Sequence, residues 1–232
     1  MSIIPLFKSH YSIGKSILTL EKSAEITDSS PISIFSIAKK HDLKEITLVE
    51  DSISGFIQAY SYAKEMGIKL IFGLRVTITE DISDKSQASL KKESKIIIFP
   101  KNNAGYKNLI KISTIASSTG FYYEPRLDYS TLREYYDDNL MIAIPFYDSF
   151  LFSNSLYGHL CVPDFSFFKP IFFVEENSLP FDNIILDKVN SYLLIFVNVT
   201  KLFNGHRVKE WFGFKVLLVQ CSIFKFSKIS IK

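Results

Sequence analysis

Short apolar runs that suit buried strands alternate along this chain with segments of helical periodicity, and this alternation restricts its possible folds most strongly. The predicted strands are 3–7, 45–49, 69–79, 95–99, 140–144 and 171–174; the predicted helices are 31–42, 53–67, 103–118 and 181–193, with a short one from the capping-box segment 131–134. Strand–helix–strand units favour parallel strands joined by right-handed crossovers. The pattern therefore predicts an α/β fold with mostly parallel strands.

The strand–helix alternation stops near residue 190. From Ser191 onward the chain is apolar and basic, and the stretch 212–226 has the composition of strands without an obvious partner. We therefore expect one α/β domain over residues 1–190 and a C-terminal extension over 191–232, to which the pattern assigns no structure.

Composition excludes several classes of protein. A hydrophobic content of 47% and a charged content of 22% are typical of a folded globular chain, and a net charge of +3 does not require a nucleic-acid partner. Cys161 and Cys221 lie too far apart in sequence to form a metal knuckle. The first residues lack the pattern of a signal peptide, and no apolar run approaches the roughly 20 residues of a membrane helix. We expect a cytoplasmic protein without a membrane partner.

Four segments, in this order, resemble one known family. They are Ser9-His10-Tyr11-Ser12-Ile13, the stretch 55–74, the run Phe99-Pro100-Lys101-Asn102-Asn103-Ala104-Gly105-Tyr106-Lys107-Asn108-Leu109, and Gly120-Phe121-Tyr122-Tyr123-Glu124-Pro125-Arg126-Leu127-Asp128. Together they resemble the PHP (polymerase and histidinol phosphatase) domain at the start of bacterial DNA polymerase III alpha-type subunits. The resemblance is strongest over residues 6–145 and thinner from there to about 190.

The resemblance implies a distorted, seven-stranded (β/α)7 barrel over residues 1–190. Active members of the family hold two or three metal ions at the carboxyl end of the barrel, through a His-x-His pair, an Asp-His pair, a Glu and later His, Cys and Asp residues. Imidazole and carboxylate groups bind Zn²⁺, Mn²⁺ or Fe²⁺, which activate water for phosphoester hydrolysis.

This chain departs from that ligand pattern at every position that the resemblance places. The expected ligands are replaced, in order, by Leu6 and Lys8, Val49 and Glu50, Arg75, and Lys95, and the Cys-bearing segment falls near Phe146. Apolar and cationic side chains cannot bind metal ions. We therefore expect no catalytic residues, no metal site and no cofactor.

The cations at these positions suggest a substitute for metal ions. We expect Lys8, Arg75 and Lys95 to form ion pairs at the rim with Glu50 or Asp51, unless these two acids are simply water-exposed loop residues. His10, Asp51 and Arg126 are further candidates for rim residues.

The remaining polar motifs have simpler explanations. His41 ends a predicted helix, where a partial positive charge is favourable, and His159 and His206 are expected in loops. Gly14-Lys15-Ser16 lacks the earlier glycine of a phosphate-binding loop. Tyr122, Tyr123 and Arg126 could stack on nucleic-acid bases, but the resemblance favours a structural loop.

These observations favour a degenerate, non-catalytic PHP domain with a structural or interaction role in DNA replication. Its expected partners are the remainder of a replicative DNA polymerase or a proofreading subunit, with DNA contacted indirectly. Two alternatives stay open: a metal-dependent phosphoesterase, such as a pyrophosphatase or 3′–5′ exonuclease, and a free-standing binding protein that has kept the barrel.

Overall fold

A computed structural model describes residues 5–22, 32–156, 164–175, 178–196 and 216–219. The strands are β1 (Leu6–Phe7), β2 (Glu45–Glu50), β3 (Lys69–Thr79), β4 (Ser94–Pro100), β5 (Arg126–Asp128), β6 (Leu140–Ile144), β7 (Ile171–Glu175) and β8 (Val216–Val219). The helices are α1 (Ile34–Lys40), α2 (Phe56–Glu65), α3 (Gln87–Leu90), α4 (Asn103–Ser117), α5 (Tyr129–Tyr135), α6 (Phe150–Leu156) and α7 (Asp182–Phe196). His159, His206 and both cysteines lie outside the described residues.

The described strands form one sheet in the order β1-β2-β3-β4-β6-β7-β8, from which β5 branches by pairing with β3. This sheet has eight strands within the described residues, where the resemblance implied seven. The pairs β1–β2, β2–β3 and β6–β7 are parallel, as the alternation of strands and helices predicts. Strand β5, which was not predicted, also pairs parallel with β3.

The direction of β4 corrects the prediction. It pairs antiparallel with both β3 and β6, so the connection from β3 is not a right-handed crossover. The segment between β3 and β4 contains only the four-residue helix α3, which is too short to cross the sheet. The chain therefore turns back on itself after β3.

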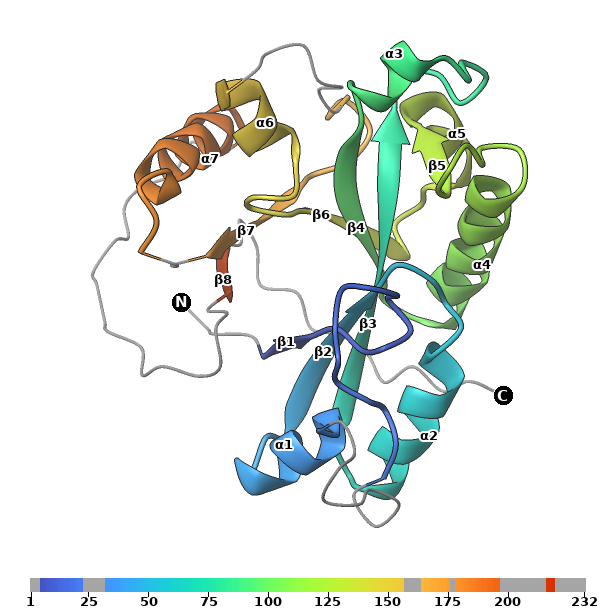
Figure 1. Ribbon diagram of the computed structural model, residues 1–232, viewed down its shortest axis with the longest axis vertical. Helices are drawn as coiled ribbons and strands as arrows, with labels where there is room; N and C mark the ends of the chain where they lie inside the picture. Colours follow the sequence, from blue (N-terminus) through green and yellow to red (C-terminus); the bar gives the residue numbers. More distant parts are fainter. Residues whose placement is uncertain (1–4, 23–31, 157–163, 176–177, 197–215, 220–232) are drawn as a thin grey trace.

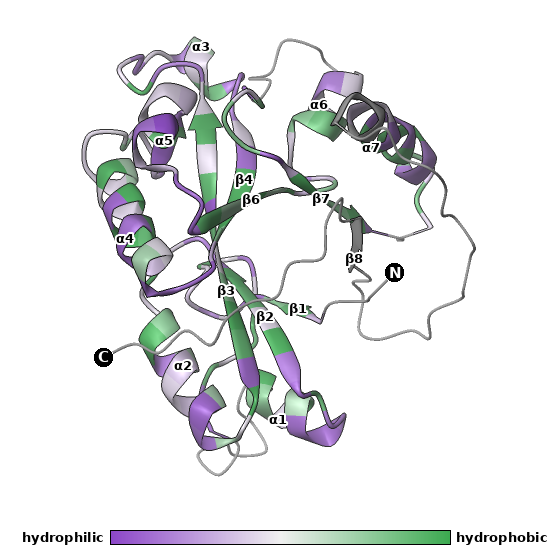
Figure 2. Ribbon diagram, turned by 180° about the vertical axis from the view of Figure 1, so that it is seen from behind, coloured by the Kyte–Doolittle hydropathy of each residue, from purple (hydrophilic) through white to green (hydrophobic). Residues whose placement is uncertain are grey.

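The sheet curls into a partial barrel with helices on its outer side (Figure 1). Alternate residues of the strands enter two separate apolar clusters, and Figure 2 shows apolar residues recurring along β2, β3 and β6. The outer cluster joins the sheet to the helices. The inner cluster fills the curl and consists of Val49, Ile71, Ile97, Phe99, Met141, Ala143, Ile171 and Phe173, with Leu6 packed against it.

A glycine on β3 allows this interior to pack. An added Cβ at Gly73 would lie 2.6 Å from a ring carbon of Phe99 and 2.8 Å from a methyl carbon of Ile97. The Phe99 ring also meets Phe173 edge-on, with 6.1 Å between ring centroids. The inside of the curl is therefore a packed core and not an open channel.

Local side chains set several helix starts, and two predicted starts were wrong. Asn102 caps α4 by accepting a hydrogen bond of 3.0 Å from the Gly105 amide. Helix α1 starts at Ile34 with Ser33 as its cap, three residues after its predicted start at residue 31. Asp128 caps α5, so this helix starts before the predicted capping box at Thr131.

The C-terminal part contributes one helix and one strand to the described fold. Helix α7 matches the predicted helix 181–193, and the expected boundary at residue 190 falls inside it. Strand β8, from the predicted extension, pairs antiparallel with β7. No described helix combines the length and the apolar character needed to cross a membrane.

Candidate functional site at the rim of the curled sheet

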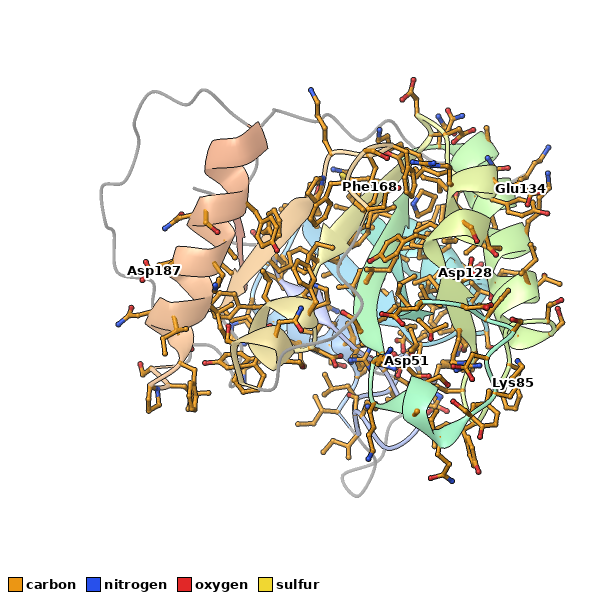
Figure 3. All side chains as sticks on the ribbon, turned by 90° about the horizontal axis from the view of Figure 1, so that it is seen from above. Asp51, Lys85, Asp128, Glu134, Phe168 and Asp187 are labelled. Atoms are coloured by element: carbon orange, nitrogen blue, oxygen red, sulfur yellow. The ribbon has the colours of Figure 1, made fainter. Side chains whose placement is uncertain are left out.

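Above the apolar interior, the inner face of β3 becomes polar. Ile71 and Gly73 are followed on the same face by Arg75 and Thr77, because side chains alternate along a strand. The parallel strand β2 ends beside this point, so Asp51, which directly follows it, lies next to Arg75. Viewed from above, Figure 3 shows Asp51 toward the middle of the molecule and Lys85 and Glu134 at its periphery.

Arg75 forms the centre of the rim. Its Nε donates to Oδ1 of Asp51 at 2.6 Å and its Nη2 to Oδ2 at 3.0 Å, which is a bidentate pair. Its Nη1 donates to Asp148, in the segment after β6. Burial alone would raise the pKa of Asp51, but the hydrogen bonds and charge of Arg75 and the charge of Lys8 hold this pKa below its ordinary value. One guanidinium thus joins segments that follow two different strands.

Lys8 lies beside this cluster. Burial lowers its pKa, and the positive charges of Arg75 and Lys15 lower it further, whereas the charges of Asp51 and Asp148 oppose the shift. Within the described part of the chain, the Lys8 ammonium has no hydrogen bond or ion pair. The two carboxylates whose charges act on Lys8, Asp51 and Asp148, are both paired with Arg75.

A second ion pair lies on the same face, toward β4. The Lys95 ammonium donates to Thr77 and, at 2.5 Å, to Oε1 of Glu124, which also accepts from the Thr77 hydroxyl at 2.5 Å. Burial would raise the pKa of Glu124, but the hydrogen bonds from Lys95 and Thr77 lower it overall. Lys95 and Glu124 also line a shallow polar pocket of about 130 Å³, together with Glu93, Ser94, Tyr147, Asp148, Ser149 and Ser153.

Arg126 is fully buried and is not available at the rim, which corrects its assignment as a rim residue. Its guanidinium donates to Oγ of Ser89 and Oε1 of Glu93, both at 3.2 Å, and to two backbone carbonyl oxygens. It also lies 4.9 Å from the centroid of the Tyr122 ring. Tyr122 and Arg126 therefore have a structural role, as the resemblance favours, with Tyr122 in the loop before β5 and Arg126 at the start of β5.

Glu50 points away from the rim. Its carboxylate accepts hydrogen bonds from the Ser9 amide at 2.7 Å and from the Ser12 hydroxyl, on the opposite face of β2 from Asp51. The side chain is fully buried, and burial raises its pKa. Glu50 thus anchors the segment after β1 and takes no part in the ion pairs.

The predicted ion pairs were partly right. The pairing of Arg75 with Asp51 is confirmed. The expectation for Lys95 was wrong, because it pairs with Glu124, and Lys8 forms no ion pair with a described residue. Glu124 and Asp148 were not predicted as members of these ion pairs. Glu124 lay inside a recognised motif, and Asp148 shortly follows a predicted strand, so position after a strand was the available signal.

The other residues at family ligand positions belong to the packing. Val49 and Leu6 contribute to the apolar interior, and Phe146 lies in the outer core. His10 is exposed and its ring contacts Tyr11, with 4.5 Å between centroids. His41 is the C-cap of α1, as the helix-end prediction stated.

The donor set does not fit the metal ions that the resemblance implies. Within the described ranges, no group of three or more His, Cys, Asp or Glu side chains lies close enough to hold a metal ion. The two positive charges of Arg75 and Lys8 balance the two carboxylates of Asp51 and Asp148, and Arg75 occupies oxygen atoms of both carboxylates. A divalent cation placed among these groups would be repelled by both cations.

Comparison with known proteins agrees with the resemblance. The family model of the PHP domain matches residues 7–185. DNA polymerase III subunit alpha of Borreliella burgdorferi is 36% identical over 129 residues, which are 54% of this chain and 11% of that protein. The subunits of Helicobacter pylori (strain J99) and Aquifex aeolicus are 34% and 31% identical over 98 and 106 residues, each 42% of this chain and 8% and 9% of those proteins. The matched segments span about a tenth of these relatives.

Proposed function

The chain belongs to the PHP domain family, and on this premise we propose that it is a non-catalytic member that serves as a structural and interaction module in DNA replication. The observation that carries this proposal is the position of Arg75, whose guanidinium is paired with Asp51 and Asp148. In the resemblance, this arginine stands where active members place a metal-binding glutamate.

The physical role of the ion pairs follows from the segments that they join. Arg75 ties the segment after β2 to the segment after β6, and Lys95 ties β4 to the loop that carries Glu124. A metal ion bound by several loops would provide the same kind of cross-link. The protein's own cations therefore hold the rim together without the ability to activate water.

The partner is proposed from the relatives. They are DNA polymerase III alpha subunits, and they are far longer than the segments that match this chain. We propose that the remainder of such a polymerase, or its proofreading subunit, binds this domain, and that contact with DNA is indirect. The alternative is a free-standing binding protein, and a test of partner binding distinguishes the two roles.

Bound metal tests the loss of catalysis. The full chain is expressed with Mn²⁺, Zn²⁺ or Fe²⁺ supplied, purified without chelator and analysed by elemental analysis. Less than about a tenth of an equivalent of bound metal per chain is expected. A structural or catalytic site would have retained its metal ion through purification. Around two equivalents would contradict the proposal and favour the metal-dependent phosphoesterase.

Co-purification tests the partner. The full chain carrying an affinity tag is mixed with a polymerase III alpha subunit that lacks its own PHP domain, and with the proofreading subunit separately. Retention of either protein is expected. If neither is retained while the chain remains folded by circular dichroism, the polymerase role is wrong and a free-standing protein is favoured.

A further inference from the structure

The segment Ser9–Leu18, here called the rim loop, exposes two large apolar side chains beside the ion-pair cluster. Ile13 is 90% exposed and Ile17 is 81% exposed. Isolated exposed apolar residues are common, but two of them in one short loop next to a charged cluster are typical of a contact surface.

The rim loop is held in a defined conformation. The His10 amide donates to the Leu18 carbonyl at 2.7 Å, which closes the loop at its base. The Tyr11 hydroxyl donates to Oε1 of Gln58 on α2 at 2.8 Å, and the Ser12 hydroxyl is bonded to the buried Glu50. The exposed isoleucines are therefore presented by a fixed scaffold, which lowers the entropy cost of binding.

The charge around the rim loop is positive. The first 20 residues contain Lys8 and Lys15 and no Asp or Glu. Neither ammonium forms an ion pair with a residue that the structure describes, and Lys8 is partly buried between the neighbouring charges. The carboxylates of Asp51 and Asp148 act on Lys8 only at longer range. Two cations without a direct ion-pair partner among the described residues, next to exposed apolar groups, complement a negatively charged, apolar partner.

We propose that the rim loop binds a protein segment that carries carboxylate side chains beside apolar ones. The apolar residues of this segment would cover Ile13 and Ile17, and a carboxylate would pair with Lys8 and Lys15. Because Lys8 lies recessed while Lys15 is exposed, an inserted side chain fits the arrangement better than a flat lipid surface. The proposal deepens the interaction role proposed above and rests on it.

Labelled amphipathic peptides test this proposal. One peptide of about 14 residues carries leucine on one helical face and glutamate on its flanks, and a matched peptide carries glutamine in place of glutamate. Fluorescence anisotropy with the full chain should show binding of the glutamate peptide and about tenfold weaker binding of the glutamine peptide. Added salt should weaken the first complex more strongly.

Variants then locate the site. Lys15→Gln and the double variant Ile13→Ser/Ile17→Ser should each weaken binding of the glutamate peptide about tenfold, and Lys8→Gln should do so if its circular dichroism is unchanged. The controls Lys107→Gln on α4 and Ile57→Ser on α2, where Ile57 is 67% exposed, should leave it unchanged. Absent binding, equal binding of both peptides, or equal loss in the controls would refute the inference.

Two further outcomes are informative. Binding to vesicles of anionic lipid that depends on Ile13 and Ile17, without binding of the glutamate peptide, would replace the protein partner with a membrane and overturn the inference. Failure of peptide binding in a metal-free chain would refute this inference alone. Retained metal would instead refute the proposed function, whatever the peptide result.

Discussion

Arg75 binds two carboxylates from segments that are far apart in sequence, and only 10% of its side chain is exposed. Its partners are more accessible, with Asp51 33% and Asp148 48% exposed. Solvent therefore screens part of each interaction. Removing the arginine would leave both carboxylates without their direct ion-pair partner, with only the charge of Lys8 nearby.

Arg75→Ala should lower the free energy of unfolding by about 2 kcal/mol, between the values for exposed and buried ion pairs. Urea unfolding followed by circular dichroism measures this change. The matched control is Arg133→Ala, which removes the exposed pair with Asp164 and should cost less than about 1 kcal/mol. Equal losses in the two variants would show that Arg75 does not hold the rim together.

The raised pKa of Glu50 predicts that its contribution to the free energy of unfolding decreases as the pH rises, whereas the contribution of an ion-paired carboxylate increases. Its raised pKa means that the folded protein holds the Glu50 proton more tightly than the unfolded chain does. This contribution to stability is complete below the unfolded pKa of about 4.3 and is lost as the pH rises through the folded-state value. Asp51 contributes in the other direction, because its pKa is lowered.

Glu50→Gln removes this titration. Relative to the wild type, the variant should gain stability as the pH rises from about 4 to neutral, because only the wild type must ionise a buried carboxyl group. Urea unfolding at a series of pH values measures the difference. A constant difference across this range would mean that Glu50 keeps an ordinary pKa.

Among the elements, β3 connects the interior to the rim. The same face of the strand carries a glycine that admits the Phe99 ring and, two residues later, the arginine that organises the rim. The strand is therefore tightly packed at one end and charged at the other. The inner packing should limit which residues can replace Gly73.

Gly73→Ala should lower the free energy of unfolding by about 1–3 kcal/mol, the usual cost of overpacking. Combining it with Phe99→Leu should recover part of that loss by making room for the new methyl group. Thermal unfolding compares both variants with Phe99→Leu alone. If the double variant loses the sum of the two single effects, the predicted clash between residue 73 and the Phe99 ring does not exist.

Local patterns predicted most elements but not the direction of every strand. Stretches rich in apolar and β-branched residues located β2, β3, β4 and β6. The reversal of β4 depends on which strands it pairs with, and no pattern within the strand reports this. The short strand β5 was missed because three residues carry almost no periodicity.

The candidate site, like the fold, was predicted only in part from the sequence. The positions that the resemblance places at the rim brought Arg75 together with Glu50 or Asp51, and the structure selects Asp51. The partner of Lys95 could not be predicted in this way, because Glu124 lies in a loop between α4 and β5. Loop positions depend on packing across the whole fold.

For the whole molecule, β8 covers β7. Its residues pair antiparallel with Phe172–Glu175 and leave β8 itself at the end of the strand order. Deleting residues 216–232 would expose the backbone hydrogen-bonding groups of an apolar strand, which promotes strand pairing between molecules.

The truncated chain should therefore self-associate, whereas the full chain should do so less. Size-exclusion chromatography with light scattering at several concentrations measures this, and a deletion of residues 220–232 that keeps β8 serves as the control. Identical molar masses for all three chains would show that β8 does not protect the edge of β7.

The packed interior also affects how easily evolution could restore a metal site in this domain. On the proposed function, a return to metal chemistry would require changes at Leu6 and Val49, which fill the apolar interior, as well as at the cations of the rim. Replacing Arg75 alone by glutamate would remove the cation that pairs with Asp51 and Asp148. It would also add a third negative charge beside these two carboxylates. Each first step would cost stability before any metal could bind. A lineage that reached this arrangement would therefore tend to stay there.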